Sequence, residues 1–233
     1  MTSRYLFLLT SIIAASGAEW DQKAFPDWSD KAVMRLLTGC GWTKPKTVQF
    51  NWRKQERRFD YRTIPGADHN KDISVGSPVG GIGAPKSSLP DKAAILLRWS
   101  FALPVRQAKA LYQMRDEKLP PAKLNELIGV PETNFVLELF GLPAEIAYKG
   151  VESIEVLLMQ SAVLRTTTGK TIKPLKVVVT TTGLQLKILI HFPKSSNLNL
   201  ADKELNFSAD MQLFMLKETF KLSEMVYQGS LEL

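Results

Sequence analysis

The sequence is poor in the residues from which most metal sites, disulfides and nucleophilic active sites are built. Its 233 residues include one cysteine, Cys40, and two histidines, His69 and His191. A single cysteine excludes an internal disulfide and any cysteine-based zinc site, and two histidines argue against a histidine-rich one. The Gly-x-Ser-x-Gly motif of many hydrolases is absent as well. We therefore assign no catalytic residue, no metal ligand and no cofactor.

Long apolar runs are also missing, and the clearest short one lies at the N-terminus. Tyr5–Ala15 follows the positive charge of Arg4 and precedes the small residues Ser16-Gly17-Ala18. A membrane-spanning helix needs about 20 apolar residues, so this arrangement is more typical of a cleaved secretory signal peptide. We expect residues 1–18 to be the signal and residues 19–233 to be exported, to the periplasm or the medium, with no transmembrane segment left. An uncleaved anchor or a buried first helix is the alternative.

Negative charge is scarce in part of the chain. Lys and Arg total 30 against 23 Asp and Glu, which gives a net charge of +7. This excess permits a polyanionic partner without requiring one. No acid occurs from Val156 to Ala201, and the basic residues there are Arg165, Lys170, Lys173, Lys176, Lys187 and Lys194. The pattern predicts either a basic sheet face or charges scattered over solvated faces and edges, where Lys discourages aggregation of strands.

Helical and strand-like segments alternate in the N-terminal half. Ser29 precedes an acid and an apolar i, i+3, i+4 pattern that begins at Val33, which predicts a helix capped by Ser29. Further helices are expected at Pro104–Lys118 and Ala122–Ile128, and strands at Thr47–Trp52, Ala93–Ala102 and Thr133–Phe140. Val151–Met159 is compatible with a helix, but its short apolar run is ambiguous between helix and strand.

Residues 53–92 contain few side chains able to build a core, and they combine basic charge with Gly and Pro. We expect a long, flexible surface loop. Such a loop is uncommon inside a domain and indicates a functional segment or a boundary between subdomains. Our interpretation is one α+β domain over residues 19–233 that contains this loop.

The C-terminal half is strand-like throughout, with a new segment about every ten residues. The expected strands are Ser161–Thr168, Leu175–Thr182, Leu184–Phe192, Lys203–Ala209, Gln212–Lys221 and Val226–Leu233. Thr182-Gly183 is suited to a tight turn. The fold class is therefore α+β, with N-terminal helices, a few strands and a C-terminal antiparallel meander that has one wet face.

Two loop segments imitate ligand-binding motifs without satisfying them. Gly80–Ser87 resembles a phosphate loop, but Pro85 stands where the motif needs a glycine N–H. Asp68–Asp72 resembles the start of a calcium loop, but Ile73 and Val79 occupy the required Gly and Glu positions. We interpret the first as a linker and the second as a polar turn.

Three other groups have both a structural and a functional interpretation. Alternation in Leu186–Phe192 places His191 with Lys187 and Leu189, so it is expected on a solvent side or edge rather than as a catalytic base. Glu152 and Glu155 suit a solvated helix better than acid–base catalysis. The tryptophans either clamp the first helix onto the sheet or form an exposed aromatic platform; they are Trp20, Trp28, Trp42, Trp52 and Trp99.

Four parts of the chain form a recognisable pattern: Trp28-Ser29-Asp30-Lys31 with Val33, Leu36-Leu37-Thr38 and Gly41-Trp42; Arg98 to Ala108; Asp202 to Phe207; and Phe220 to Gly229. Together they resemble an uncharacterised family of exported bacterial proteins, known mostly as hypothetical proteins of soil bacteria. The resemblance implies export and a single intact unit. It implies no activity, cofactor or catalytic residue.

The function we expect is that of a non-enzymatic, exported envelope binding or structural module. Its partner would be an anionic envelope polymer or another envelope protein, and no nucleic acid is expected. The interaction candidates are Arg53, Arg57, Arg58, Arg62, Arg98, Trp99 and Arg106. The alternative is an exported hydrolase with a carboxylate-based site, for which the available acids are Asp60, Asp68, Asp72, Glu138, Glu145 and Glu152.

Overall fold

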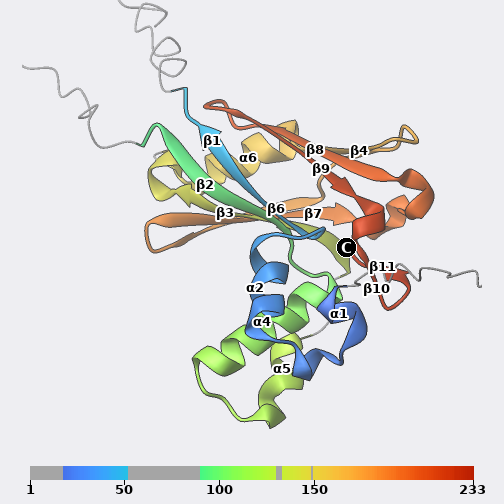
Figure 1. The fold of residues 1–233 in the computed structure, drawn as a ribbon. Helices are drawn as coiled ribbons and strands as arrows, with labels where there is room; N and C mark the ends of the chain where they lie inside the picture. Colours follow the sequence, from blue (N-terminus) through green and yellow to red (C-terminus); the bar gives the residue numbers. More distant parts are fainter. Residues whose placement is uncertain (1–17, 52–89, 130–132, 148) are drawn as a thin grey trace, which may run out of the picture.

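Two antiparallel sheets form the body of the protein, and most helices gather at one side of it (Figure 1). The computed structural model describes residues 18–51, 90–129, 133–147 and 149–233. The five-stranded sheet has the order β1-β2-β3-β7-β6, with β1 (Thr43–Gln49), β2 (Lys92–Trp99), β3 (Asn134–Pro143), β6 (Lys176–Thr182) and β7 (Gln185–Pro193). The four-stranded sheet has the order β5-β4-β8-β9, with β4 (Val163–Thr166), β5 (Thr171–Ile172), β8 (Glu204–Asp210) and β9 (Met215–Lys221). The predicted α+β class and C-terminal antiparallel meander are confirmed.

The helices are α1 (Glu19–Gln22), α2 (Asp30–Thr38), α4 (Leu103–Asp116), α5 (Leu124–Ile128) and α6 (Val151–Ser161). Short 3-10 turns are η1 (Phe25–Asp27), η3 (Pro121–Lys123), η4 (Ala144–Ala147), η5 (Lys194–Ser196), η6 (Leu200–Asp202) and η7 (Leu222–Glu224). Helices α2 and α4 pack against each other, and α5 packs on α4. Within the described ranges, none of these helices has the length and apolar character needed to cross a membrane.

Helix α2 begins where its sequence predicts. The Ser29 hydroxyl accepts a hydrogen bond from the Ala32 N–H at 3.2 Å and donates one to Glu19 at 2.7 Å. A cap of this kind satisfies a backbone donor that the first helical turn leaves without a partner.

Replacing this cap tests its contribution. We expect Ser29→Ala to lower the free energy of unfolding by about 1 kcal/mol, measured by chemical denaturation. Ser29→Thr keeps the hydroxyl and should recover most of the loss. A Thr variant as unstable as the Ala variant would show that the hydroxyl does not stabilise α2.

The inner faces of the two sheets pack against each other and form one continuous buried core. Trp99 on β2 meets Phe220 on β9 with ring centroids 5.5 Å apart, and Phe192 on β7 meets Phe207 on β8 at 6.5 Å. All of these side chains are buried. Edge-to-face aromatic pairs add to the stabilisation from apolar burial, so they hold the two sheets together.

Ion pairs close one side of this two-sheet sandwich, and a helix covers the other side. On one side, Lys44 and Lys46 of β1 form ion pairs with Glu224 at 3.2 Å and Glu218 at 2.9 Å, which join β1 to β9 and η7. On the other side, α6 packs along β6 and β8. The Glu155 carboxylate accepts a hydrogen bond from the Val179 N–H at 2.9 Å, so the outer edge of β6 is partly satisfied by a side chain.

Strand β1 corrects one prediction, because it covers Thr43–Gln49 rather than Thr47–Trp52. Pro45, which cannot continue the preceding helix, lies inside this strand. β1 is the edge strand of its sheet, and an edge position tolerates the missing N–H of proline.

Strand β3 corrects a second prediction, because it continues beyond Phe140 to Pro143. The register shifts between Phe140 and Leu142, so Gly141 is the extra residue of a β-bulge. Gly141 has φ +101°, and a Cβ there would lie 2.7 Å from the Ala94 carbonyl oxygen. Glycine is therefore required for the strand to pass this point.

A third correction concerns the last predicted strand, Val226–Leu233. It is a hairpin of two short strands, β10 (Val226–Tyr227) and β11 (Ser230–Leu231). The turn between them contains Gln228 at φ 50° and Gly229 at φ 78°. This left-handed backbone cannot continue an extended strand.

The tryptophans are part of the core rather than an exposed platform. Trp20, Trp28, Trp42 and Trp99 are all at most 8% exposed; Trp52 lies outside the described residues. The Trp42 indole N–H donates to the Glu232 carbonyl oxygen at 2.8 Å. The N-terminal helices are thus tied to the C-terminal segment, which agrees with the clamping interpretation.

Candidate functional site

The side of the five-stranded sheet that faces away from the four-stranded sheet is the candidate site, and we call it the outer face. Alternate residues of a strand point to opposite sides of a sheet, so the register decides which residues belong to it. They are Thr43, Pro45, Thr47, Gln49, Lys92, Ala94, Leu96, Arg98, Val136, Glu138, Phe140, Lys176, Val178, Thr180, Thr182, Gln185, Lys187, Leu189 and His191.

A buried ion cluster occupies one end of the outer face. Glu138 on β3 is 3% exposed, and its Oε2 atom accepts the hydrogen bonds of Arg98, Ser100 and Lys109. Lys109 Nζ on α4 lies 2.8 Å away, Ser100 Oγ 2.9 Å, and Arg98 Nη2 3.1 Å. Arg98 also donates to the Leu37 carbonyl oxygen at 3.3 Å. The cluster therefore joins β2, β3, α2 and α4.

The electrostatics of this cluster favour a carboxylate that is ionised at neutral and mildly acidic pH. Burial raises the pKa of Glu138, but the Lys109 and Arg98 charges outweigh it and lower the pKa from 4.5 to about 2. Burial and the nearby Arg98 and Lys187 charges lower the pKa of Lys109, although Glu138 acts in the opposite direction. A carboxylate held in this way does not donate a proton near neutral pH, so Glu138 is not suited to be the acid of a hydrolase.

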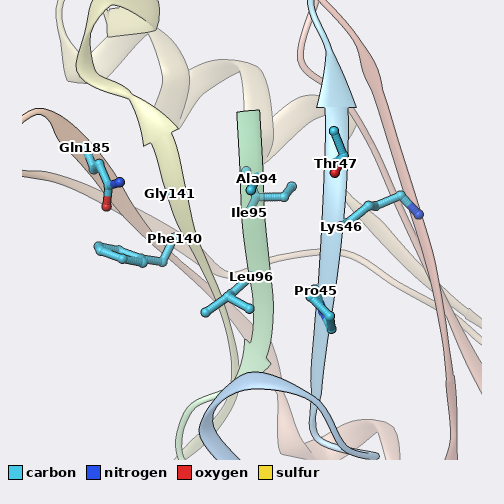
Figure 2. Close-up of a pocket in the computed structure, with 9 residues that line it drawn as sticks. All are labelled: Pro45, Lys46, Thr47, Ala94, Ile95, Leu96, Phe140, Gly141 and Gln185. Carbon is cyan, nitrogen blue, oxygen red and sulfur yellow. The ribbon is translucent and has the colours of Figure 1, made fainter. Parts of the chain in front are cut away.

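A shallow groove of about 420 Å³ lies on the outer face, and its lining residues Leu96 and Phe140 are two positions along β2 and β3 from Arg98 and Glu138 of the cluster. Pro45 on β1, Leu96 on β2 and Phe140 on β3 face it from neighbouring strands (Figure 2). Figure 2 also shows that the Lys46 side chain runs away from the groove, toward its partner Glu218 on β9. The remaining lining comes from Thr47, Ala94, Ile95, Gly141 and Gln185.

Positive charge surrounds this apolar surface. The outer face carries Lys92, Arg98, Lys176 and Lys187, and Lys109 reaches it from α4. Glu138 is the one acid in the described strands of this sheet. Within the part of the chain that the structure describes, Lys187 forms no ion pair, unlike Lys170, which meets Asp202 at 2.9 Å. The outer face is therefore apolar at its groove and cationic around it.

The outside of the four-stranded sheet differs from the outer face both in apolar character and in charge. Its outward residues on β8 and β9 are mostly polar and of mixed charge, namely Glu204, Asn206, Ser208, Asp210, Met215, Lys217, Thr219 and Lys221. This is the composition of a solvated sheet face. The outer face of the five-stranded sheet differs, because its groove is lined mainly by apolar side chains.

The structure brings one of the predicted interaction residues to this surface. Arg98 is a member of the ion cluster. Trp99 is fully buried, so it cannot contact a partner directly. Arg106 donates to the carbonyl oxygens of Ile128 at 3.3 Å and Gly129 at 3.0 Å, which fastens the end of α5. Arg53, Arg57, Arg58 and Arg62 lie outside the described residues.

The other candidate residues are dispersed. His191 lies on the outer face opposite Val136, with intermediate exposure. Glu145 and Glu152 are exposed, and Glu155 is turned toward β6. The acids Asp60, Asp68 and Asp72, the Asp68–Asp72 turn and the Gly80–Ser87 loop lie outside the described residues. Within the described ranges, no group of three His, Cys, Asp or Glu is placed to hold a metal ion.

Sequence reasoning missed two members of the site, Lys109 and Lys187. Lys109 stands in an ordinary helical pattern, and nothing local indicates that it reaches β3. Lys187 carried a usable signal, because alternation places it on the side of Leu189 and away from the buried Ile188. Its neighbours across the sheet, Phe140 and Thr180, follow only from the register.

The site has to be interpreted from its own geometry. No protein-family model, no curated protein and no solved structure matches this chain.

Proposed function

We propose that the protein is an exported, non-enzymatic binding module of the cell envelope and that it binds an anionic component through the outer face. The observation that carries this proposal is the charge of that face. Lys109 and Arg98 share one carboxylate oxygen, and Lys187 stands beside them without a counter-ion among the described residues. A second anion would find an unbalanced positive potential there. Export itself rests on the signal-like N-terminus, residues 1–18.

The experiment is co-sedimentation of the purified protein with envelope fragments at low and high salt. We expect pelleting at low salt and its loss near 1 M salt, where the screening length falls to about 3 Å. Lys187→Gln should weaken pelleting about fivefold, because a single charge near an anionic surface contributes about 1 kcal/mol.

Lys217→Gln is the matched control, because it removes the same charge from the outside of the other sheet. It should pellet like the unaltered protein. Pelleting that is indifferent to salt, or that falls equally in both variants, would contradict binding through the outer face.

A further inference from the structure

The chemistry of the groove defines a narrower ligand class, on the basis of the proposed function. We propose that the outer face binds a carboxylate with an acyl chain, with the chain over Pro45, Leu96 and Phe140 and the carboxylate at Lys187 and Lys109. The groove volume of about 420 Å³ lies in the range of small-ligand sites, which is about 300–1,000 Å³. The ligand is thus a fatty-acid-type anion rather than a polymer.

The floor of the groove offers apolar contact and few backbone hydrogen bonds. It lies on β1, β2 and β3, which pair with one another across Pro45↔Leu96 and Leu96↔Phe140. The backbone groups of paired strands point along the sheet and not out of its face. An extended peptide laid on this floor would leave its own amide groups without partners, which is costly. An alkyl chain has no such groups, so the floor favours it over a peptide.

Register also places the charged end of the ligand. Lys187 is the direct neighbour of Phe140 across the β3–β7 pair, so its side chain leaves the outer face beside a residue that lines the groove. Lys187 is near enough to Lys109 to lower its pKa by charge repulsion. A carboxylate between these two ammonium groups would relieve that repulsion and accept charge-assisted hydrogen bonds from both.

A second copy of the chain does not fit this surface. Pairing two outer faces would bring Lys92, Lys176 and Lys187 of one copy toward those of the other. Like charges brought together at an interface oppose association. The same cations attract a ligand with a single negative charge.

The experiment is an isothermal titration calorimetry measurement, in which decanoate below its critical micelle concentration is titrated into the purified protein. We expect one saturable site, with binding about tenfold weaker for decanol, which lacks the charge, and no binding of acetate, which lacks the chain. Lys187→Gln should weaken decanoate binding about fivefold and leave decanol unchanged. Leu96→Ser should weaken both ligands, because the chain loses apolar contact.

Lys217→Gln and Met215→Ser, on the outside of the other sheet, are the matched controls and should bind normally; thermal unfolding checks that every variant folds. Decanoate binding that is absent, that equals decanol binding, or that survives both outer-face substitutions would overturn the acyl-carboxylate assignment. Envelope pelleting of the same samples separates the two proposals. If Lys187→Gln still weakens pelleting while decanoate does not bind, the binding module stands and its ligand is a different anion.

Discussion

Replacing Glu138 by Gln is expected to lower the free energy of unfolding at neutral pH by about 3–5 kcal/mol, because it leaves two partly buried cations without their counter-ion. The amide keeps the size of the side chain, and its oxygen can still accept from Ser100 and Arg98. The expected loss therefore reports the charge of Glu138 and not a cavity. Chemical denaturation at pH 7 measures it.

The same carboxylate predicts how stability depends on pH. Its pKa is lowered from 4.5 in the unfolded chain to about 2 in the folded protein. A lowered pKa contributes stability that is complete above 4.5 and is lost as the pH falls toward 2. The shift corresponds to about 3 kcal/mol. The pKa of Asp202 is also lowered by its neighbours, so Asp202 contributes to the loss of stability at acid pH in the unaltered protein and in Glu138→Gln alike. The difference in stability between these two proteins therefore isolates the contribution of Glu138.

Glu145→Gln is the matched control, because Glu145 is exposed and an exposed substitution usually changes stability by less than about 0.5 kcal/mol. We expect the stability difference between the unaltered protein and Glu138→Gln to shrink steadily as the pH falls from 4.5 toward 2. A difference that stays constant over that range would show that Glu138 is not held ionised by its neighbours.

Gly41→Ala is expected to destabilise the protein by about 3 kcal/mol or more, through overpacking of backbone against backbone. A Cβ at this position would lie 2.1 Å from the Glu224 carbonyl oxygen and 2.7 Å from its carbon. The obstacle cannot rotate away as a side chain would. It also belongs to η7, whose Leu222 is fully buried, as is Met225 just beyond the turn. Relief would require the C-terminal segment to move away from the loop between α2 and β1.

Gly39→Ala provides the control two residues away. A Cβ at Gly39 meets nothing within 4 Å, and its φ of −175° is ordinary extended backbone. We expect a change below about 0.5 kcal/mol. Thermal and chemical unfolding of both variants measure the contrast. Equal stabilities for Gly39→Ala and Gly41→Ala would show that the close approach of Gly41 to η7 does not constrain the fold.

The sequence by itself determined the local elements of this protein. The Ser29 cap, the helix that begins beside Pro104 and the alternating strand around Leu186–Phe192 all follow from neighbouring residues. Caps and periodic patterns act over a few positions, because helical hydrogen bonds join residues four apart and strand side chains alternate. The α+β class follows from the order of such elements.

Tertiary structure alone decided how these strands pair and where the site lies. The C-terminal strands divide between two sheets, because β7 pairs with β3 while β8 pairs with β4. Nothing local distinguishes these pairings, which depend on which apolar faces bury each other across the whole core. The same packing brings Lys109 to Glu138 and Lys187 beside Phe140. A candidate site built from such distant residues forms only when the strands of the sheet pair in this register.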